Sequence, residues 1–249
     1  MATDSRFMSG PSFGVRCLLR GLSSLRTPGL RRYIWVPLLI NLIVYGLGFW
    51  AAGHYFSAVM DWLLPGWLDW LRWLLWPLLA LSLMAVAFFT FTIVANVIGS
   101  PFYGVLAARV QRMAGELIAE DPAPGLVRDV AQSLVTETQR LGYMALRALP
   151  ILLMFPIPGI NLLATALWMV FGAWSLSLEY FSYPLENHGL KFSQQREFLT
   201  GRRLEILGFG GAVMLGLAVP VLNILIPPAA VIGATLYCQS RKPLAAKGN

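Results

Sequence analysis

The sequence predicts an all-α membrane protein with two full transmembrane helices, two partly penetrating helical hairpins and amphipathic cytoplasmic helices. Of its 249 residues, 57% are hydrophobic and only 12% are charged, with a mean hydropathy of +0.64, whereas soluble domains carry about 25% charged residues. Four long runs contain no charge at all. Basic residues flank these runs, so the net charge of +7 indicates membrane topology and not nucleic-acid binding. We treat residues 1–249 as a single membrane domain.

Residues 1–32 form a basic leader that carries six arginines. Its apolar residues share one helical face, which predicts a short helix lying in the membrane interface. These residues are Phe13, Cys17, Leu18 and Leu22. The first uncharged run, residues 33–56, has 24 residues, enough to cross a hydrocarbon core of ~30 Å. It is too long for the core of a cleavable signal peptide, so we expect it to stay in the membrane.

Residues 57–72 are rich in tryptophan and contain a single arginine, Arg72. This composition is typical of an interfacial aromatic belt and predicts an outer loop. Residues 73–98 form the second uncharged span. An apolar stripe at helical spacing predicts that this helix continues into the cytoplasm to about residue 120, where prolines and a glycine end it.

An amphipathic helix is expected at residues 126–147, followed by uncharged runs at 148–178 and 206–240. Each run is interrupted near its middle, at Pro158-Gly-Ile-Asn161 and at Pro220-Val-Leu-Asn223. Neither run is long enough for two crossings of ~20 residues and a turn. Of the 19 Lys and Arg residues, 18 lie in segments assigned to the cytoplasm. We therefore predict two hairpins that enter from the cytoplasm, covered by a bundle or an oligomer around a polar path.

The start of the first span predicts an oxyanion site. Thr27 is a good N-cap and Pro28 suits the first helical position, where no amide donor is needed. The next N–H groups would then lack partners at the positive end of the helix dipole. The predicted ligands are Gly29, Leu30, Arg31 and Arg32, the two arginines adding guanidinium forks for sulfate or phosphate. The alternative is that both arginines only anchor the span on its cytoplasmic side.

Several polar residues in apolar surroundings are candidates for a transport path. Asn161 and Asn223 lie at the predicted hairpin tips, where they either cap helices or line the path. Glu179 follows 31 uncharged residues and is either solvated at the interface or paired with an arginine such as Arg109 or Arg147. Asn96, near the cytoplasmic end of the second span, and Arg109 complete the candidate path.

No catalytic, metal or cofactor site is expected. No nucleophile elbow, phosphate loop or metal-binding motif occurs. Cys17 and Cys238 belong to no Cys/His set, and His54 and His188 stand apart from any nucleophile or carboxylate set. A glycine pair in the first span, at residues 46 and 48, suits close helix packing.

Motifs along nearly the whole chain resemble the CysZ sulfate transporter family. The matching segments are Pro28-Gly-Leu-Arg-Arg32, Val36-Pro-Leu-Leu-Ile-Asn41, Leu75-Trp-Pro77, Ala95-Asn96, Ser100-Pro-Phe102, Pro158-Gly-Ile160, Tyr183-Pro184, Glu186-Asn-His188 and Pro220-Val-Leu-Asn223. Each fragment alone is a weak signal, but their order and spacing together are specific. The resemblance implies sulfate uptake across the bacterial inner membrane without ATP hydrolysis, feeding cysteine synthesis. It also implies a homo-oligomer, with sulfate bound at Gly29, Leu30, Arg31 and Arg32.

The sequence thus favours a channel-like, multi-pass inner-membrane protein whose partners are sulfate, the lipid bilayer and further copies of itself, with no nucleic acid. The alternative function is a regulatory or scaffolding membrane protein that binds sulfate without conducting it. A membrane-embedded enzyme has no support, because no acid–base or nucleophile set is visible in the sequence.

Overall fold

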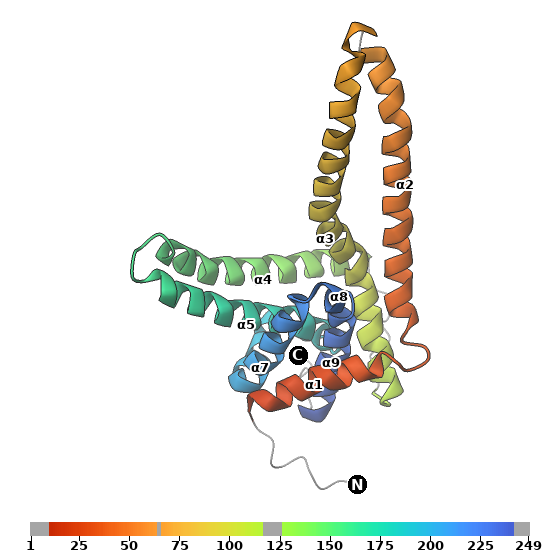
Figure 1. Ribbon diagram of the computed structural model, residues 1–249. Helices are drawn as coiled ribbons and strands as arrows, with labels where there is room; N and C mark the ends of the chain where they lie inside the picture. The colour runs from red at the N-terminus through yellow and green to blue at the C-terminus, as the bar shows by residue number, and fades with distance from the viewer. Residues whose placement is uncertain (1–9, 64–65, 117–125, 242–249) are drawn as a thin grey trace. The chain divides into compact units, whose positions relative to one another are not determined.

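The computed structural model describes residues 10–63, 66–116 and 126–241, and in these ranges the chain is helical, with turns and no strands (Figure 1). The all-α prediction is therefore confirmed. The chain divides into two compact units, one made of residues 1–31 with 103–249 and the other of residues 32–102. Each unit is described by itself.

The unit of residues 32–102 is a helical hairpin. Helix α2 (Arg32–Leu63) and helix α3 (Arg72–Met113) run antiparallel and are joined through the 3-10 helix η1 (Gly66–Leu71) (Figure 1). The rings of Phe56 and Trp76 meet edge to face with centroids 4.8 Å apart. The two helices contain the predicted spans, and α2 continues beyond residue 56. The expected outer loop at 57–72 is thus largely helical in its described part.

Helix α3 ends earlier than the predicted residue 120, at Met113. Gly115 has a φ of +78°, a conformation that favours glycine. Its N–H donates to Arg112 O at 3.0 Å, and the N–H of Glu116 donates to Gln111 O at 3.1 Å. This pair of hydrogen bonds is a Schellman motif, which satisfies the last carbonyls and ends the helix. The rest of the predicted extension, residues 117–120, lies outside the described residues.

The core of the other unit forms around the leader helix α1 (Pro11–Ser24), which packs against α7 (Arg203–Leu217) and α9 (Ile226–Arg241). Glycines permit this contact: a Cβ atom at Gly14 would lie 2.0 Å from Glu205 O, and one at Gly21 would lie 2.1 Å from Ala229 O. The predicted face of α1 is correct, since Cys17 and Leu18 are buried. Its partner is protein, however, and not the membrane interface alone.

Burial between these helices affects the chemistry of Cys17. Desolvation raises the pKa of the Cys17 thiol to about 11, because the apolar surroundings disfavour the thiolate. At neutral pH the thiol is therefore protonated and a poor nucleophile.

Helix α5 (Asn161–Asn187) completes the core by packing against α7. A Cβ atom at Gly210 would lie 1.8 Å from Ala173 O, so the two backbones touch. The hydroxyl of Ser177 donates to Ile206 O at 2.7 Å. The rings of Phe181 and Phe209 meet edge to face with centroids 5.0 Å apart. Hydrogen bonds and aromatic contacts therefore accompany the close approach.

The uncharged run at 148–178 turns where its prolines and glycine predicted a break. Helix α4 (Leu126–Met154) reaches Met154, and α5 begins at Asn161. The expected amphipathic helix at 126–147 and the first arm of this hairpin are one helix, which runs through Pro150. Beyond α5, the short helix α6 (Phe192–Thr200) precedes α7, and α8 (Pro220–Asn223) lies between α7 and α9.

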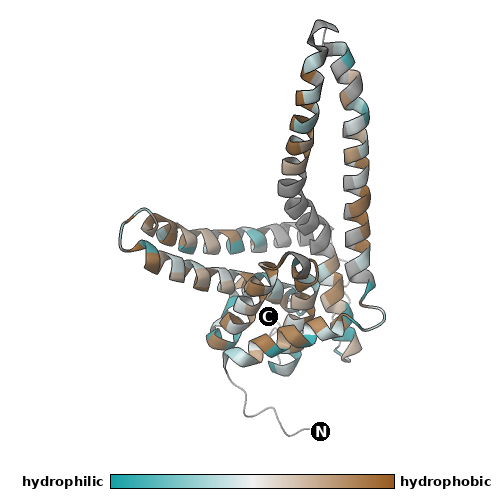
Figure 2. Ribbon diagram, in the orientation of Figure 1, coloured by the Kyte–Doolittle hydropathy of each residue, from teal (hydrophilic) through white to brown (hydrophobic). Residues whose placement is uncertain are grey.

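Many large apolar side chains are exposed on α4 and α5 near their connecting turn, and Figure 2 shows apolar positions gathered at that end of the hairpin. They include Leu152, Leu153, Phe155, Ile157, Ile160, Leu162 and Leu163. Many side chains of α2 and α3 lie outside the described residues. Where the side chains of a helix are described throughout, α5 has the length and composition for a membrane crossing, and most of its apolar window is not buried by the chain. A soluble fold does not usually expose such a surface.

Candidate functional site

The predicted anion segment forms a turn before α2. The N–H of Leu30 donates to Thr27 O at 3.2 Å, and Gly29 between them has a φ of +95°. A proline at the second position and a positive-φ glycine at the third define a type II turn. Glycine is required here because a Cβ atom disfavours this conformation. The chain becomes helical only at Arg32.

This geometry corrects the predicted helix start. Thr27 is not the N-cap of α2 and Pro28 is not in its first turn, because the Pro-Gly pair selects a turn over a helix. The Leu30 N–H, expected to be unpaired, is used by the turn. Its side chain is 3% exposed and anchors the turn in the core. Leu30 therefore anchors the turn, and neither its N–H nor its side chain is available to an anion.

Gly29 and Arg31 remain accessible on either side of that buried leucine. In the described part of the chain, no backbone acceptor is paired with the N–H of Gly29 or Arg31. An exposed guanidinium next to free amides is a suitable arrangement for an oxyanion. The side chain of Arg32 lies outside the described residues.

A second turn of the same kind precedes α5. The N–H of Ile160 donates to Ile157 O at 3.2 Å, and Gly159 has a φ of +83°. The sequence had paired this break with the one at Pro220, but that segment is the short helix α8. The structural counterpart of the turn at Gly159 is thus the turn at Gly29. Proline is shared by all three segments, but only these two have the following glycine that a type II turn requires.

The two candidate asparagines are exposed. Asn161 is the first residue of α5, whose N-cap is Ile160 with no side-chain hydrogen bond. Asn223 is the last residue of α8. The described contacts do not assign either side chain to helix capping, one of the two alternatives that the sequence left open.

Glu179 is half-buried on α5, and the arginine whose charge acts on it is Arg140 of α4. The two arginines that the sequence suggested lie elsewhere. Arg147 stacks on the ring of Tyr143 at 3.6 Å, and Arg109 is exposed. Arg140 itself forms an ion pair of 2.8 Å with Glu137. The side chain of Asn96 is outside the described residues. Among the path candidates whose side chains are described, no hydrogen bond or ion pair joins one to another.

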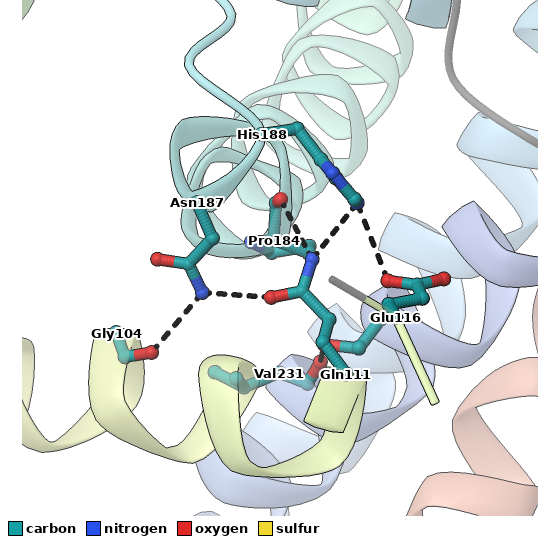
Figure 3. Close-up of polar contacts among 8 residues, drawn as sticks. Gly104, Gln111, Glu116, Pro184, Asn187, His188 and Val231 are labelled. Carbon is teal, nitrogen blue, oxygen red and sulfur yellow. Dashed lines mark hydrogen bonds and ion pairs between the residues drawn. The ribbon is translucent and has the colours of Figure 1, made fainter. Parts of the chain in front are cut away.

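A polar network that the sequence analysis missed lies between the C-terminal ends of α3 and α5 (Figure 3). Gln111 is fully buried. Its Nε2 donates to Pro184 O at 3.1 Å, and its Oε1 accepts a 2.8 Å hydrogen bond from Asn187 Nδ2. Asn187 Nδ2 also donates to Gly104 O at 3.3 Å. Gln111 thus satisfies one of the last four carbonyls of α5, which have no partner in their own helix.

His188 extends this network. Its Nε2 lies 3.0 Å from Gln111 Nε2 and 3.4 Å from Glu116 Oε2. Because Pro184 O needs a donor, the amide of Gln111 is oriented with its N–H groups toward His188. Nε2 of His188 then accepts, and the neutral ring carries its proton on Nδ1. A proton on Nε2 would face Glu116 instead, so the acceptor role toward Gln111 and the donor role toward Glu116 belong to different positions of the ring proton.

A buried acidic residue, Glu205, links α7 to α9. It is 6% exposed. Its Oε2 accepts from the hydroxyl of Tyr237, and its Oε1 forms a 2.7 Å ion pair with Arg241. The guanidinium of Arg241 also lies 4.5 Å from the ring centroid of Phe13. Neutralised and hydrogen-bonded in this way, the carboxylate is a packing element. No group of three metal-binding side chains occurs in the described part of the chain.

Comparison with known proteins assigns the chain to a family. The family described as sulfate transporter CysZ/etoposide-induced protein 2.4 matches residues 17–228. A protein of Pseudomonas fluorescens (strain SBW25), named sulfate transporter CysZ, is 40% identical over 92% of this chain and 91% of its own length. A second P. fluorescens protein of that name (strain Pf0-1) is 38% identical over 92% of each chain. A third, from Pectobacterium atrosepticum, is 36% identical over 89% of this chain and 82% of its own.

The expected resemblance is therefore confirmed. The family is one of transporters, so the prediction that the chain is not an enzyme is also confirmed. The chain belongs to the sulfate transporter CysZ/etoposide-induced protein 2.4 family.

Proposed function

We propose that this protein conducts sulfate across the bacterial inner membrane in a channel-like manner, without hydrolysing ATP, and so supplies sulfur assimilation and cysteine biosynthesis. The proposal rests on the similarity of this chain, over 92% of its length, to relatives named sulfate transporters. The absence of a phosphate loop from the sequence supports a mechanism without ATP hydrolysis. Its partners are sulfate, the bilayer and further copies of the same chain.

Sulfate binds, in this proposal, at Gly29, Leu30, Arg31 and Arg32. The turn supports this role because it leaves Gly29 and Arg31 exposed while the buried Leu30 side chain anchors them to the core. Free backbone amides and guanidinium groups are strong donors to oxyanions. Leu30 takes part through this anchorage, since its N–H already donates to Thr27 O.

The proposed membrane arrangement has two full crossings, at residues 33–56 and 73–98, and two hairpins that enter from the cytoplasm. Helix α2 has 32 residues and would span about 48 Å at 1.5 Å per residue, more than a hydrocarbon core. For the hairpin of α4 and α5, the support is the exposed apolar surface near its turn, where Leu162 is 80% exposed. Lipid is a suitable cover for that surface.

The proposed path uses Asn96, Arg109, Asn161, Glu179 and Asn223. Asn161 is exposed between Ile160 and Leu162, which are also exposed. A polar amide at a membrane-embedded tip needs water or protein beside it. Neighbouring copies of the chain would supply that cover, which is why we propose a homo-oligomer around the path.

Labelled sulfate uptake into liposomes that contain only this protein, without ATP, tests the function. Uptake above that of protein-free liposomes supports conduction. Sulfate binding without uptake would favour the alternative, a regulatory or scaffolding membrane protein.

A further inference from the structure

Two arginines from different helices meet at one aromatic ring. Arg147, on α4, has its guanidinium carbon 3.6 Å from the ring centroid of Tyr143, one turn earlier on the same helix. Arg196, on α6, lies 5.4 Å from the same centroid. The guanidinium carbons of Arg147 and Arg196 are therefore no farther apart than the sum of these two distances. Like charges repel at such separations, so a structural reason is needed for their being held together.

The ring that holds them is fixed by its neighbours. The hydroxyl of Tyr143 accepts a 3.2 Å hydrogen bond from Trp174 Nε1 on α5. The buried ring of Phe192 meets Tyr143 edge to face with centroids 5.6 Å apart. Three helices thus position one ring, and the ring's negative face attracts guanidinium groups.

The donors of both arginines remain largely unused. Arg147 donates one 3.4 Å hydrogen bond to Tyr143 O. Among the described residues, neither Arg147 nor Arg196 forms an ion pair, although Arg140, also on α4, pairs with Glu137. Both side chains are exposed. A guanidinium stacked on a ring keeps the N–H groups at its edge free for a planar pair of oxygens.

We propose that Arg147 and Arg196, held by Tyr143, form a second oxyanion site, which takes a tetrahedral anion such as sulfate or the phosphate of a lipid headgroup. Such an anion accepts from two guanidinium groups at once and offsets their mutual repulsion. The site is separate from the turn at Gly29 and does not depend on that turn binding sulfate. Nothing in its chemistry distinguishes free sulfate from a phosphodiester, so the test has one arm for each.

The test uses the full chain carrying Arg31→Ala and Arg32→Ala, so that the turn does not contribute. Inorganic sulfate is titrated against the detergent-solubilised protein, and phosphatidylglycerol binding is measured in nanodiscs of defined composition. Arg147→Gln with Arg196→Gln should weaken the binding of at least one of these ligands tenfold or more. Arg203→Gln, which removes an exposed arginine of α7, is the matched control and should change neither affinity.

Two variants test the role of the Tyr143 ring. Tyr143→Phe keeps the aromatic face and should retain binding, whereas Tyr143→Leu should weaken it. Thermal unfolding of every variant checks that the fold is intact. If the double Gln variant loses affinity for sulfate only, the ligand of the site is a free oxyanion. If it loses affinity for phosphatidylglycerol only, the ligand is a lipid headgroup. The proposal is overturned if neither affinity changes in the double Gln variant, or if Arg203→Gln weakens binding equally.

Discussion

The hydroxyl of Tyr237 on α9 donates a 2.5 Å hydrogen bond to Oε2 of Glu205 on α7. Glu205 stands near the beginning of α7 and Tyr237 near the end of α9, so the bond ties together the two ends of the uncharged run at 206–240. Arg241 neutralises the same carboxylate. The contact explains why a single acidic residue is tolerated next to that run.

Removing this hydroxyl should destabilise the fold. In Tyr237→Phe, Oε2 of a buried carboxylate loses its donor, and such hydrogen bonds to charged groups contribute about 1.5–3 kcal/mol. Thermal or denaturant unfolding in detergent should reveal a loss of that size. The control is Tyr55→Phe, because Tyr55 is exposed on α2 and surface changes usually stay within about 0.5 kcal/mol. Equal losses in the two variants would remove the special role of the Tyr237 hydroxyl.

A second prediction concerns the backbone of the turn. Gly29→Ala places a Cβ atom on a residue with a φ of +95°, which costs roughly 1–3 kcal/mol. We expect lower stability and weaker sulfate binding, because the strained turn displaces Arg31. Gly53→Ala is the matched control: Gly53 lies inside α2 with open space around it, where alanine favours the helix. Full stability in Gly29→Ala, with unchanged sulfate affinity, would contradict this account of the turn.

The arginines themselves give a third prediction. Arg31→Ala with Arg32→Ala should weaken sulfate binding at least tenfold, since each charge-assisted hydrogen bond contributes about 1.5–3 kcal/mol. Lysine at both positions keeps the charge but loses the fork, so an intermediate affinity is expected. Equilibrium binding of labelled sulfate provides the measurement, with Arg203→Ala, which removes an exposed arginine of α7, as the control. An unchanged affinity in the double alanine variant would leave the arginines with the role of topology anchors.

The path residues give a fourth prediction. In a background without Cys17 and Cys238, cysteines at positions 161 and 223 should react with small water-soluble thiol reagents, because the proposed path around them is filled with water. A cysteine at Leu167, which we assign to the lipid-facing surface, should not react. Asn161→Leu and Asn223→Leu should reduce sulfate flux more than sulfate binding. Normal flux in both leucine variants would remove these residues from the path.

Local patterns predicted much of the fold. Long uncharged runs identified helices, and the Pro-Gly pair at residues 158–159 identified the turn between α4 and α5. The same kind of pair at Pro28 was interpreted as a helix start, because proline suits both a first helical turn and the second position of a type II turn. The positive φ of Gly29 decided between them. The glycine that follows the proline was the sequence signal that could have identified the turn.

Contacts between distant helices were not predictable in the same way. The sequence assigned close packing to Gly46 and Gly48, yet in the described chain a Cβ atom at either would meet nothing within 4 Å. Close approaches occur at other glycines, among them Gly14 and Gly21, which meet residues about 200 positions later. Gln111 belongs to no sequence motif, and its partners on α5 emerge only from helix packing. Pairing of that kind is a property of the tertiary fold, which periodicity alone does not encode.

The most direct test of sulfate conduction is the initial rate of labelled sulfate uptake into ATP-free liposomes containing this protein alone. The wild type and the Arg31→Ala, Arg32→Ala variant are compared at equal protein content, with protein-free liposomes as the baseline. We predict uptake well above baseline for the wild type and at least a tenfold lower rate for the variant at sulfate concentrations below saturation. Wild-type uptake no faster than that of protein-free liposomes, in protein that still binds sulfate, would contradict conduction.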